Sequence, residues 1–229
     1  VHSTATIANA ISQSSESELK KYLEEDFIFI PYCRPGFTLT MEIKKLILPS
    51  TNIIILEDHG LIVAGDDIED TYKLLLKIHK KLDLIRNEKL AFDYLEEITN
   101  IDGYKHKNTD KYKLFSTHNE KLFSLFTKSF YPDHVIFLGP GIPTFLEDKE
   151  ANEFIQNLKR KNINLPPYLI LKYKGLFENT LAIPAAKEMI DCFLEVLLRI
   201  DLSKSLKILS SQQESELLNW DIEIYRQSI

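Results

Sequence analysis

The segment that most constrains this chain is Asn52–Asp67, with the sequence NIIILEDHGLIVAGDD. It contains two apolar runs, Asn52–Leu56 and Leu61–Ala64, which are typical of buried strands. The polar stretch between them ends in Gly60, a residue that adopts a positive φ at little steric cost and so allows a sharp reversal. The sequence therefore predicts a tight hairpin that holds His59 rigidly at a strand end, a placement suited to a metal ligand or an acid–base group.

Length and charge restrict the class of protein. A chain of 229 residues forms one large domain, or one domain with a smaller appendage. Its formal net charge of -6 argues against a general nucleic-acid binder and against a protein that binds anionic membranes. No apolar run approaches the roughly 20 residues that span a bilayer. We therefore expect neither nucleic acid nor membrane as a partner.

The cysteines and the start of the chain give two further expectations. Cys33 and Cys192 lie far apart and match no metal or redox spacing. Reduced thiols in a cytoplasmic protein are the favoured interpretation, and one long-range disulfide is the alternative. The chain starts with Val1, inside what looks like an element, so we expect the natural protein to extend further toward the N-terminus.

A second histidine, His2, stands just before a predicted helix at Thr4–Ile11, for which Ser3 or Thr4 is the expected N-cap. Open α/β sheets commonly bind their ligands at such strand-to-helix junctions. A divalent metal held by imidazoles needs ligands that converge from distant parts of the sequence, and His2 and His59 satisfy that requirement. A structural pair, held by hydrogen bonds alone, fits the pattern equally well.

Arg34 is the candidate substrate-binding residue outside the histidine pair. It precedes Pro35 in the stiff loop 31–36, and a guanidinium held this way can bind a carboxylate or phosphate through two parallel hydrogen bonds. A surface position or a structural ion pair is the competing interpretation. His79, within a predicted helix, and His106, within a predicted linker, are both expected at the surface.

The remaining periodicity predicts an alternation of helices and strands. The predicted helices are Glu16–Glu25, Thr40–Leu48 with Thr40 as its cap, Asp67–Arg86 continuing to about Ile98, Ser116–Phe130, Lys149–Lys161, Ala185–Ile200 and Ser210–Gln227 with Ser210 or Ser211 as its cap. The predicted strands are Asp26–Ile30, His134–Leu138 and Tyr168–Lys174. This order suggests an α/β chain in three parts: residues 1–100, a linker over 101–115, and a smaller α/β region over 116–229.

Three stretches, VHSTATIANAI, IPYCRPG and NIIILEDHGLIVAGDDIEDTY, together resemble the class II aldolase/adducin-like family. That family carries a metal-binding His-x-His at a strand end and a third metal histidine in an Asn-His-Gly turn. His59 matches the third histidine, with Asp58 where Asn is usual. In the favoured register His2 is the second ligand and the first precedes Val1. In the other register His2 is the first ligand and Thr4 replaces the second.

The resemblance implies a fold and an activity. Residues 1–100 would be the C-terminal portion of a three-layer α/β domain, with a mainly antiparallel central sheet flanked by helices. The implied activity is that of a metal-dependent lyase, which cleaves a small sugar phosphate or hydroxy-acid in a retro-aldol reaction. His2 and His59 would bind a divalent ion, Zn²⁺ first and Mn²⁺ or Co²⁺ as alternatives. The family's catalytic glutamate lies upstream of the matching motifs, and the family's enzymes form homo-oligomers.

Two alternatives stay open. The substitution at Asp58 and the second register are compatible with a non-catalytic, adducin-like scaffold. A sugar-phosphate epimerase would use the same metal site and the same bond cleavage. Two later stretches, YPDHVIFLGPG and ELLNWDIEIYRQ, look like subgroup signatures, and neither receives a role from the sequence.

Overall fold

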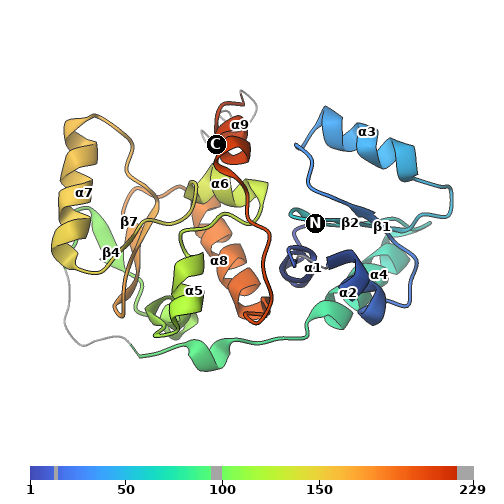
Figure 1. The fold of residues 1–229 in the computed structure, drawn as a ribbon, viewed down its shortest axis with the longest axis horizontal. Helices are drawn as coiled ribbons and strands as arrows, with labels where there is room; N and C mark the ends of the chain where they lie inside the picture. The colour runs from blue at the N-terminus through green and yellow to red at the C-terminus, as the bar shows by residue number, and fades with distance from the viewer. Residues whose placement is uncertain (13–14, 94–99, 221–229) are drawn as a thin grey trace.

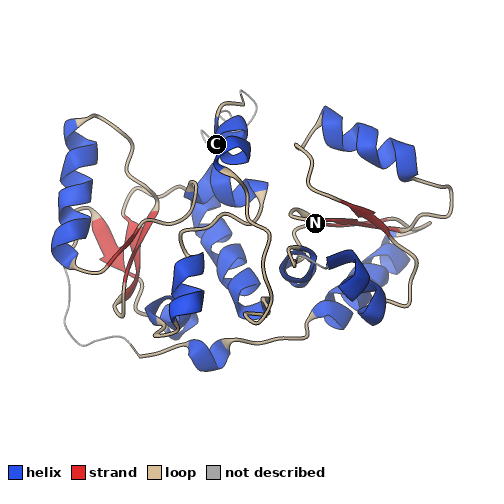
Figure 2. Ribbon diagram, in the orientation of Figure 1, coloured by secondary structure: helices blue, strands red, loops and turns tan. Residues whose placement is uncertain are grey.

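The computed structural model describes residues 1–12, 15–93 and 100–220, which form two units lying side by side (Figure 1). Each unit has a small sheet with helices around it (Figure 2). Residues 1–84 are named the N-terminal unit, and the described residues from 100 onward the C-terminal unit. The α/β class is confirmed, and each unit has a small mixed sheet; the sheet of the N-terminal unit, expected to be mainly antiparallel, has one parallel and one antiparallel pair of strands. The three-layer arrangement stays a prediction.

The N-terminal sheet has the order β1-β2-β3, in which β1 (Ile28–Ile30) runs parallel and β3 (Gly60–Val63) antiparallel to the central β2 (Ile53–Leu56). Side chains alternate between its faces. Ile53 and Ile55 pack with α2 (Ser15–Tyr22) and α4 (Ile68–Leu82), whereas Ile54 and Leu56 pack toward α3 (Phe37–Leu46). Figure 1 shows α3 on the opposite side of this sheet from α1, α2 and α4. The predicted hairpin is confirmed.

Helix α1 (Thr4–Ala10) joins the two units. The Ser3 side chain caps it by accepting a hydrogen bond from the backbone of Thr6, as the sequence predicts. Small residues let both sides of this helix approach other elements closely. Ala5 and Ala10 belong to the core of the N-terminal unit, whereas Ile7 and Ala8 pack into the larger core built around α8 (Pro184–Arg199). The segment that carries His2 is therefore fixed from both sides.

The C-terminal sheet has the order β4-β7-β6-β5, with β5 parallel to β6 and the other neighbours antiparallel. Its strands are β4 (Tyr104–His106), β5 (Thr144–Phe145), β6 (Tyr168–Leu171) and β7 (Gly175–Asn179). The helices of this unit besides α8 are α5 (Glu120–Leu125), α6 (Pro132–Leu138), α7 (Asp148–Arg160) and α9 (Ser211–Leu218). A 3₁₀ helix, η2 (Asp110–Ser116), precedes α5, and another, η1 (Glu88–Leu90), lies in the segment between the two units.

The predicted strand His134–Leu138 is wrong, because these residues lie in α6. Pro132 occupies the first turn, where its missing N–H costs nothing, and the preceding Tyr131 is extended. Nearly every residue of α6 is buried, so the helix has no polar face and its sequence carries no period of 3.6. A short apolar run of this kind does not distinguish a strand from a buried helix.

Other boundaries also differ from the predictions. Helix α4 ends at Leu82, short of the predicted continuation toward Ile98, and residues 94–99 lie outside the described part. Helix α3 begins at Phe37, so Thr40 is inside it and its hydroxyl donates to the backbone of Gly36. Helix α5 covers only part of 116–130, because Asn119 caps it.

The segment expected to be a linker carries β4 and most of η2, and β7 was not anticipated. His106, expected to be solvated, is half-buried in β4, where its ring stacks on Phe177. The predicted cap of the last helix, Ser210, is confirmed, and residues 221–227 of that prediction lie outside the described part. Among the described residues, no helix is long and apolar enough to cross a membrane.

Candidate metal centre

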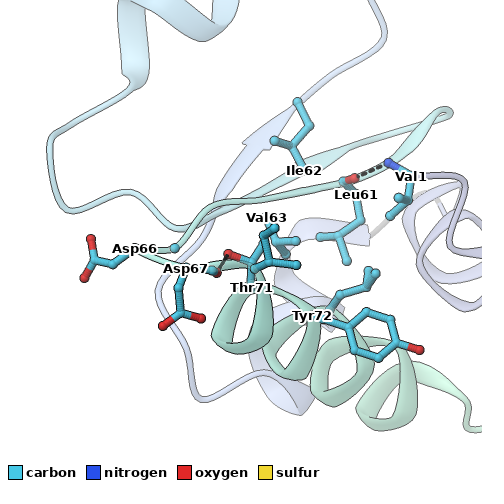
Figure 3. Close-up of a pocket in the computed structure, with 11 residues that line it drawn as sticks. Val1, Leu61, Ile62, Val63, Asp66, Asp67, Thr71 and Tyr72 are labelled. Atoms are coloured by element: carbon cyan, nitrogen blue, oxygen red, sulfur yellow. Dashed lines mark hydrogen bonds between the residues drawn. The ribbon is translucent and has the colours of Figure 1, made fainter.

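Backbone contacts on both sides of His2 fix its position. The Val1 amino group donates to the carbonyl of Leu61 at 2.8 Å, and the Leu61 N–H donates back to the Val1 carbonyl at 3.0 Å. Figure 3 shows the first of these bonds at the edge of β3. Ser3 then caps α1 on the other side. His2 thus stands between a strand-like contact and a helix start, with little backbone freedom left.

His59 is the last residue of the turn between β2 and β3. Gly60 follows with φ of +129°, and a Cβ at this position would stand 2.5 Å from the Val1 carbonyl oxygen. Only glycine therefore permits both the reversal and the close passage of the chain before His2. As a result the rings of His2 and His59 lie close together, with 5.1 Å between their centroids and a tilt of 38° between their planes.

A third polar group comes from the C-terminal unit. Asp133 lies in the first turn of α6 and is only 3% exposed. Its Oδ2 is 2.9 Å from Nε2 of His2. One ligand atom from each of His2, His59 and Asp133 can be chosen so that all three lie within 4.8 Å of one another. Sequence reasoning missed Asp133, since its stretch resembled a subgroup signature and nothing in the sequence paired it with His2.

These three residues fit a divalent ion. Two imidazole nitrogens and one carboxylate oxygen are a donor set that Zn²⁺, Mn²⁺ and Co²⁺ accept. In the part of the chain that the structure describes, no other group of histidine, cysteine and acidic side chains converges in this way. The structure therefore shows a possible His/Asp metal site, and the identity of its ion is a separate question.

Two buried carboxylates support the turn that carries His59. Glu57 is 6% exposed, and its oxygens accept the Tyr32 backbone N–H at 3.0 Å and the ammonium group of Lys207. Asp58 is 8% exposed, and burial, with the nearby charge of Glu57, raises its pKa to about 8. Lys207 opposes that shift. The turn is thus anchored by a cation from the C-terminal unit.

A cavity of about 220 Å³ lies beside this turn, between the two units. Its polar lining includes Tyr32, Asp58 and Gln213, and its apolar lining includes Phe130 and Leu209. A small space with a few convergent polar groups next to possible metal ligands is typical of a site for a small polar molecule. The larger hollow of about 570 Å³ in Figure 3, between β3 and α4, is mainly apolar. None of the three possible ligands lines either cavity, and the smaller one adjoins them through Asp58, which directly precedes His59.

The structure places Arg34 against the C-terminal end of the described chain. Its guanidinium lies over the ring of Trp220, 4.7 Å from the ring centroid. A Cβ at Gly36 would stand 2.9 Å from the same ring, so this loop and Trp220 are packed closely. The contact is a cation–π interaction that joins the loop 31–36 of the N-terminal unit to the last described residue of the C-terminal unit. A role for Arg34 in substrate binding stays a prediction.

Two further histidines, His79 and His134, make contacts that support the fold. Nδ1 of His79 is 3.0 Å from the Ser3 hydroxyl, so this residue, expected at the helix surface, supports the start of α1. His134 is fully buried, and burial lowers its pKa to about 3. Its ring packs edge-on against Phe193, with 4.5 Å between the centroids. His134 is therefore a neutral core residue, although it directly follows Asp133.

Comparison with known proteins confirms the resemblance for the N-terminal unit. Residues 1–84 match the family model of the class II aldolase and adducin N-terminal domain. A protein of Bacillus subtilis (strain 168), described as "Uncharacterized oxidoreductase YuxG", is 25% identical over 91 residues, which are 39% of this chain and 13% of that protein. The match thus spans a small part of that relative's length. No solved structure matches the chain.

Proposed function

We propose that this protein is a metal-dependent lyase that breaks a carbon–carbon bond of a small sugar phosphate or hydroxy-acid by retro-aldol cleavage. The observation that carries the proposal is the convergence of His2 and His59, from separate segments, at 5.1 Å between ring centroids. The match of residues 1–84 to the class II aldolase and adducin N-terminal domain supports it. That match covers only part of the chain, so activity and substrate are proposals for the whole protein.

His2 and His59 would hold the divalent ion, with Zn²⁺ favoured and Mn²⁺ or Co²⁺ as alternatives. When bound, such an ion acts as a Lewis acid on the oxygens of the substrate. The chain's own part is to fix the two rings. The Val1–Leu61 backbone pair holds His2, and the buried Glu57 holds the turn before His59. Rigid placement of this kind keeps the reacting groups oriented before the substrate binds.

No general base is assigned to the described residues. Both oxygens of Glu57 are engaged, one by the Tyr32 N–H and the other by Lys207, so this carboxylate is a structural group in this structure. The adjoining cavity, with Tyr32, Asp58 and Gln213 in its wall, offers hydrogen-bonding partners to the hydroxyl groups of a small substrate. The substrate would thus extend from the histidine pair toward the junction of the two units.

The test is metal content and affinity of the intact protein. We expect about one zinc per chain by elemental analysis, and at least ~100-fold weaker binding in His59→Ala, because a direct ligand is lost. Lys174→Ala is the matched control, since Lys174 holds the same place before a glycine in the β6–β7 turn, where it pairs with Asp148. Absence of zinc even after incubation with excess metal, or unchanged affinity in His59→Ala, would overturn the proposal.

A non-catalytic, adducin-like scaffold is the second candidate. It is favoured by the His2–Asp133 pair at 2.9 Å, which can join the two units as an ion pair without any metal. The metal measurement separates the candidates, since a scaffold needs no ion. If metal is bound, product analysis with a panel of sugar phosphates distinguishes a lyase, which releases an aldehyde, from an epimerase, which returns an isomer of the substrate.

A further inference from the structure

The stretch YPDHVIFLGPG had no role in the sequence, and the structure places its acidic residue in an unusual setting. Asp133 is 3% exposed within α6, which packs against α8 and α9. A carboxylate is costly to bury unless a cation or a metal compensates its charge. Across the junction its Oδ2 faces Nε2 of His2 at 2.9 Å. The acidic residue of this stretch is therefore directed toward the histidine pair.

Packing on both sides holds this approach in place. Ile7 and Ile11 follow His2 in the chain and belong to the large core that also contains Phe193 and Leu138. This core lies across the boundary between the units, so α1 and the end of α6 share one set of buried contacts. The packing of the cores thus helps to set the distance from Asp133 to His2, beside the direct contact between the two side chains.

We propose that Asp133 is a direct carboxylate ligand of the ion held by His2 and His59, so that the C-terminal unit completes the metal centre of the N-terminal unit. This inference rests on the proposed metal binding of the two histidines. The ligand atoms of all three residues lie within 4.8 Å of one another. Imidazoles together with one carboxylate are a ligand set found in catalytic zinc sites.

The competing arrangement has Asp133 as an orienting residue. In many metal sites a carboxylate accepts the free N–H of a ligating histidine and only fixes the ring. In that case the ion would contact the histidines alone, and the acidic side chain would act through His2. Direct ligation and orientation predict different spectra once the side chain at position 133 is changed.

The experiment uses Co²⁺ as an absorbing probe of the intact protein. In Asp133→Cys, a direct ligand would give a thiolate-to-cobalt charge-transfer absorption that the wild type lacks, although both proteins contain Cys33 and Cys192. Asp191→Cys is the matched control, because Asp191 is an ion-paired carboxylate of the same unit that lies on α8 and pairs with Lys111. We expect the absorption in the first variant only.

A second variant keeps the test decisive if the cysteine variant does not fold. Asp133→Asn preserves the shape of the side chain and can still accept a hydrogen bond from His2. For a direct ligand we expect at least ~10-fold weaker Co²⁺ binding and altered cobalt d–d bands, with unchanged circular dichroism of the metal-free protein. Unaltered d–d bands and affinity in Asp133→Asn, or no charge-transfer absorption in a folded Asp133→Cys, would overturn the inference.

The two proposals fail in distinguishable ways. If the wild type binds no Co²⁺ or Zn²⁺, both the lyase and the role of Asp133 are wrong. If the wild type binds metal and His59→Ala abolishes binding, but the variants at Asp133 behave as the wild type does, the histidine site stands. The C-terminal unit would then have no part in the coordination.

Discussion

The two units contain hairpins of the same form, and only one of them carries the candidate site. In β2–β3 and in β6–β7, a strand of four residues is followed by a turn of three residues, and a glycine opens the returning strand. The registers correspond, with Leu56 opposite Gly60 and Leu171 opposite Gly175. Both glycines have a positive φ, +129° and +94°. The two hairpins therefore share strand length, register and glycine position, although Tyr173 in the second turn has a φ of +65° and no residue of turn 57–59 has a positive φ.

The difference is where each turn lies in the molecule. The turn 57–59 meets the C-terminal unit, so Glu57 is buried and is paired with Lys207. The turn 172–174 is only half-buried, and its Lys172 pairs with Glu120, whose side chain is 70% exposed. A hairpin turn thus becomes a possible site when a second body of structure covers it and brings further polar groups to it.

The largest expected effect comes from changing the two glycines. Gly60→Ala should lower the free energy of unfolding by at least about 2 kcal/mol and abolish metal binding, because its Cβ meets the Val1 carbonyl at 2.5 Å and displaces His2. Gly175→Ala should cost about 1–2 kcal/mol from backbone strain and leave metal affinity unchanged. Urea unfolding and zinc titration of both variants measure these effects. Equal metal affinity in the two variants would contradict the comparison.

The second-largest expected effect on stability comes from replacing the lysine that pairs with a carboxylate at each turn. Lys207→Met leaves the buried carboxylate of Glu57 without its cation, so we expect a loss of about 1–3 kcal/mol. Lys172→Met removes a pair with an exposed partner and a cation–π contact to Phe123, and should destabilise the protein less than Lys207→Met does. Urea unfolding compares the two variants.

The double variant Glu57→Gln/Lys207→Met is the control for this second pair. It removes the uncompensated charge together with its partner, so we expect it to regain part of the stability lost in Lys207→Met. A double variant that is less stable than the single one would show that Glu57 stabilises the turn without Lys207.

Local signals made part of this fold predictable. The β-branched run before His59, Gly60, and the caps Ser3 and Ser210 act within a few residues, and the structure confirms the hairpin and both caps. The proximity of His2 and His59 depends instead on the backbone pairing of Val1 with Leu61 at the edge of β3, a contact between residues far apart in the sequence. Their role as ligands stays a proposal.

The contacts between the two units could not be predicted from the sequence. Asp133 reaches His2, and Lys207 reaches Glu57, across the boundary between the units, where α1 packs against α8 and the Lys207 backbone N–H donates to the Ile11 carbonyl. No periodicity records such a contact, since both partners are ordinary charged residues in their own segments. The helix α6 was missed for a related reason. Burial of nearly all its residues removes the polar face by which a helix is recognised in a sequence. The segment that carries Asp133 was therefore predicted to be a strand.

The smallest expected effect is the pH dependence of stability that His106 contributes at the β6–β7 hairpin. Nε2 of His106 lies 2.7 Å from the carbonyl of Lys174, in the turn that corresponds to the one with His59. Burial lowers the pKa of His106 below its ordinary value of 6.5. The native state then binds fewer protons than the unfolded state, so this residue's contribution to stability is present above pH 6.5 and falls as the pH drops below that value.

His106→Gln keeps a side-chain hydrogen-bond donor and removes the titration. The difference in unfolding free energy between wild type and variant should therefore change by less than about 1 kcal/mol between pH 7.5 and pH 5, with the wild type losing more. Metal affinity should not change, since His106 belongs to the hairpin without the site. An NMR titration of the His106 ring measures its pKa directly. A value at or above 6.5 would show that the second turn favours the charged ring, and the contrast between the two hairpins would then include their electrostatics.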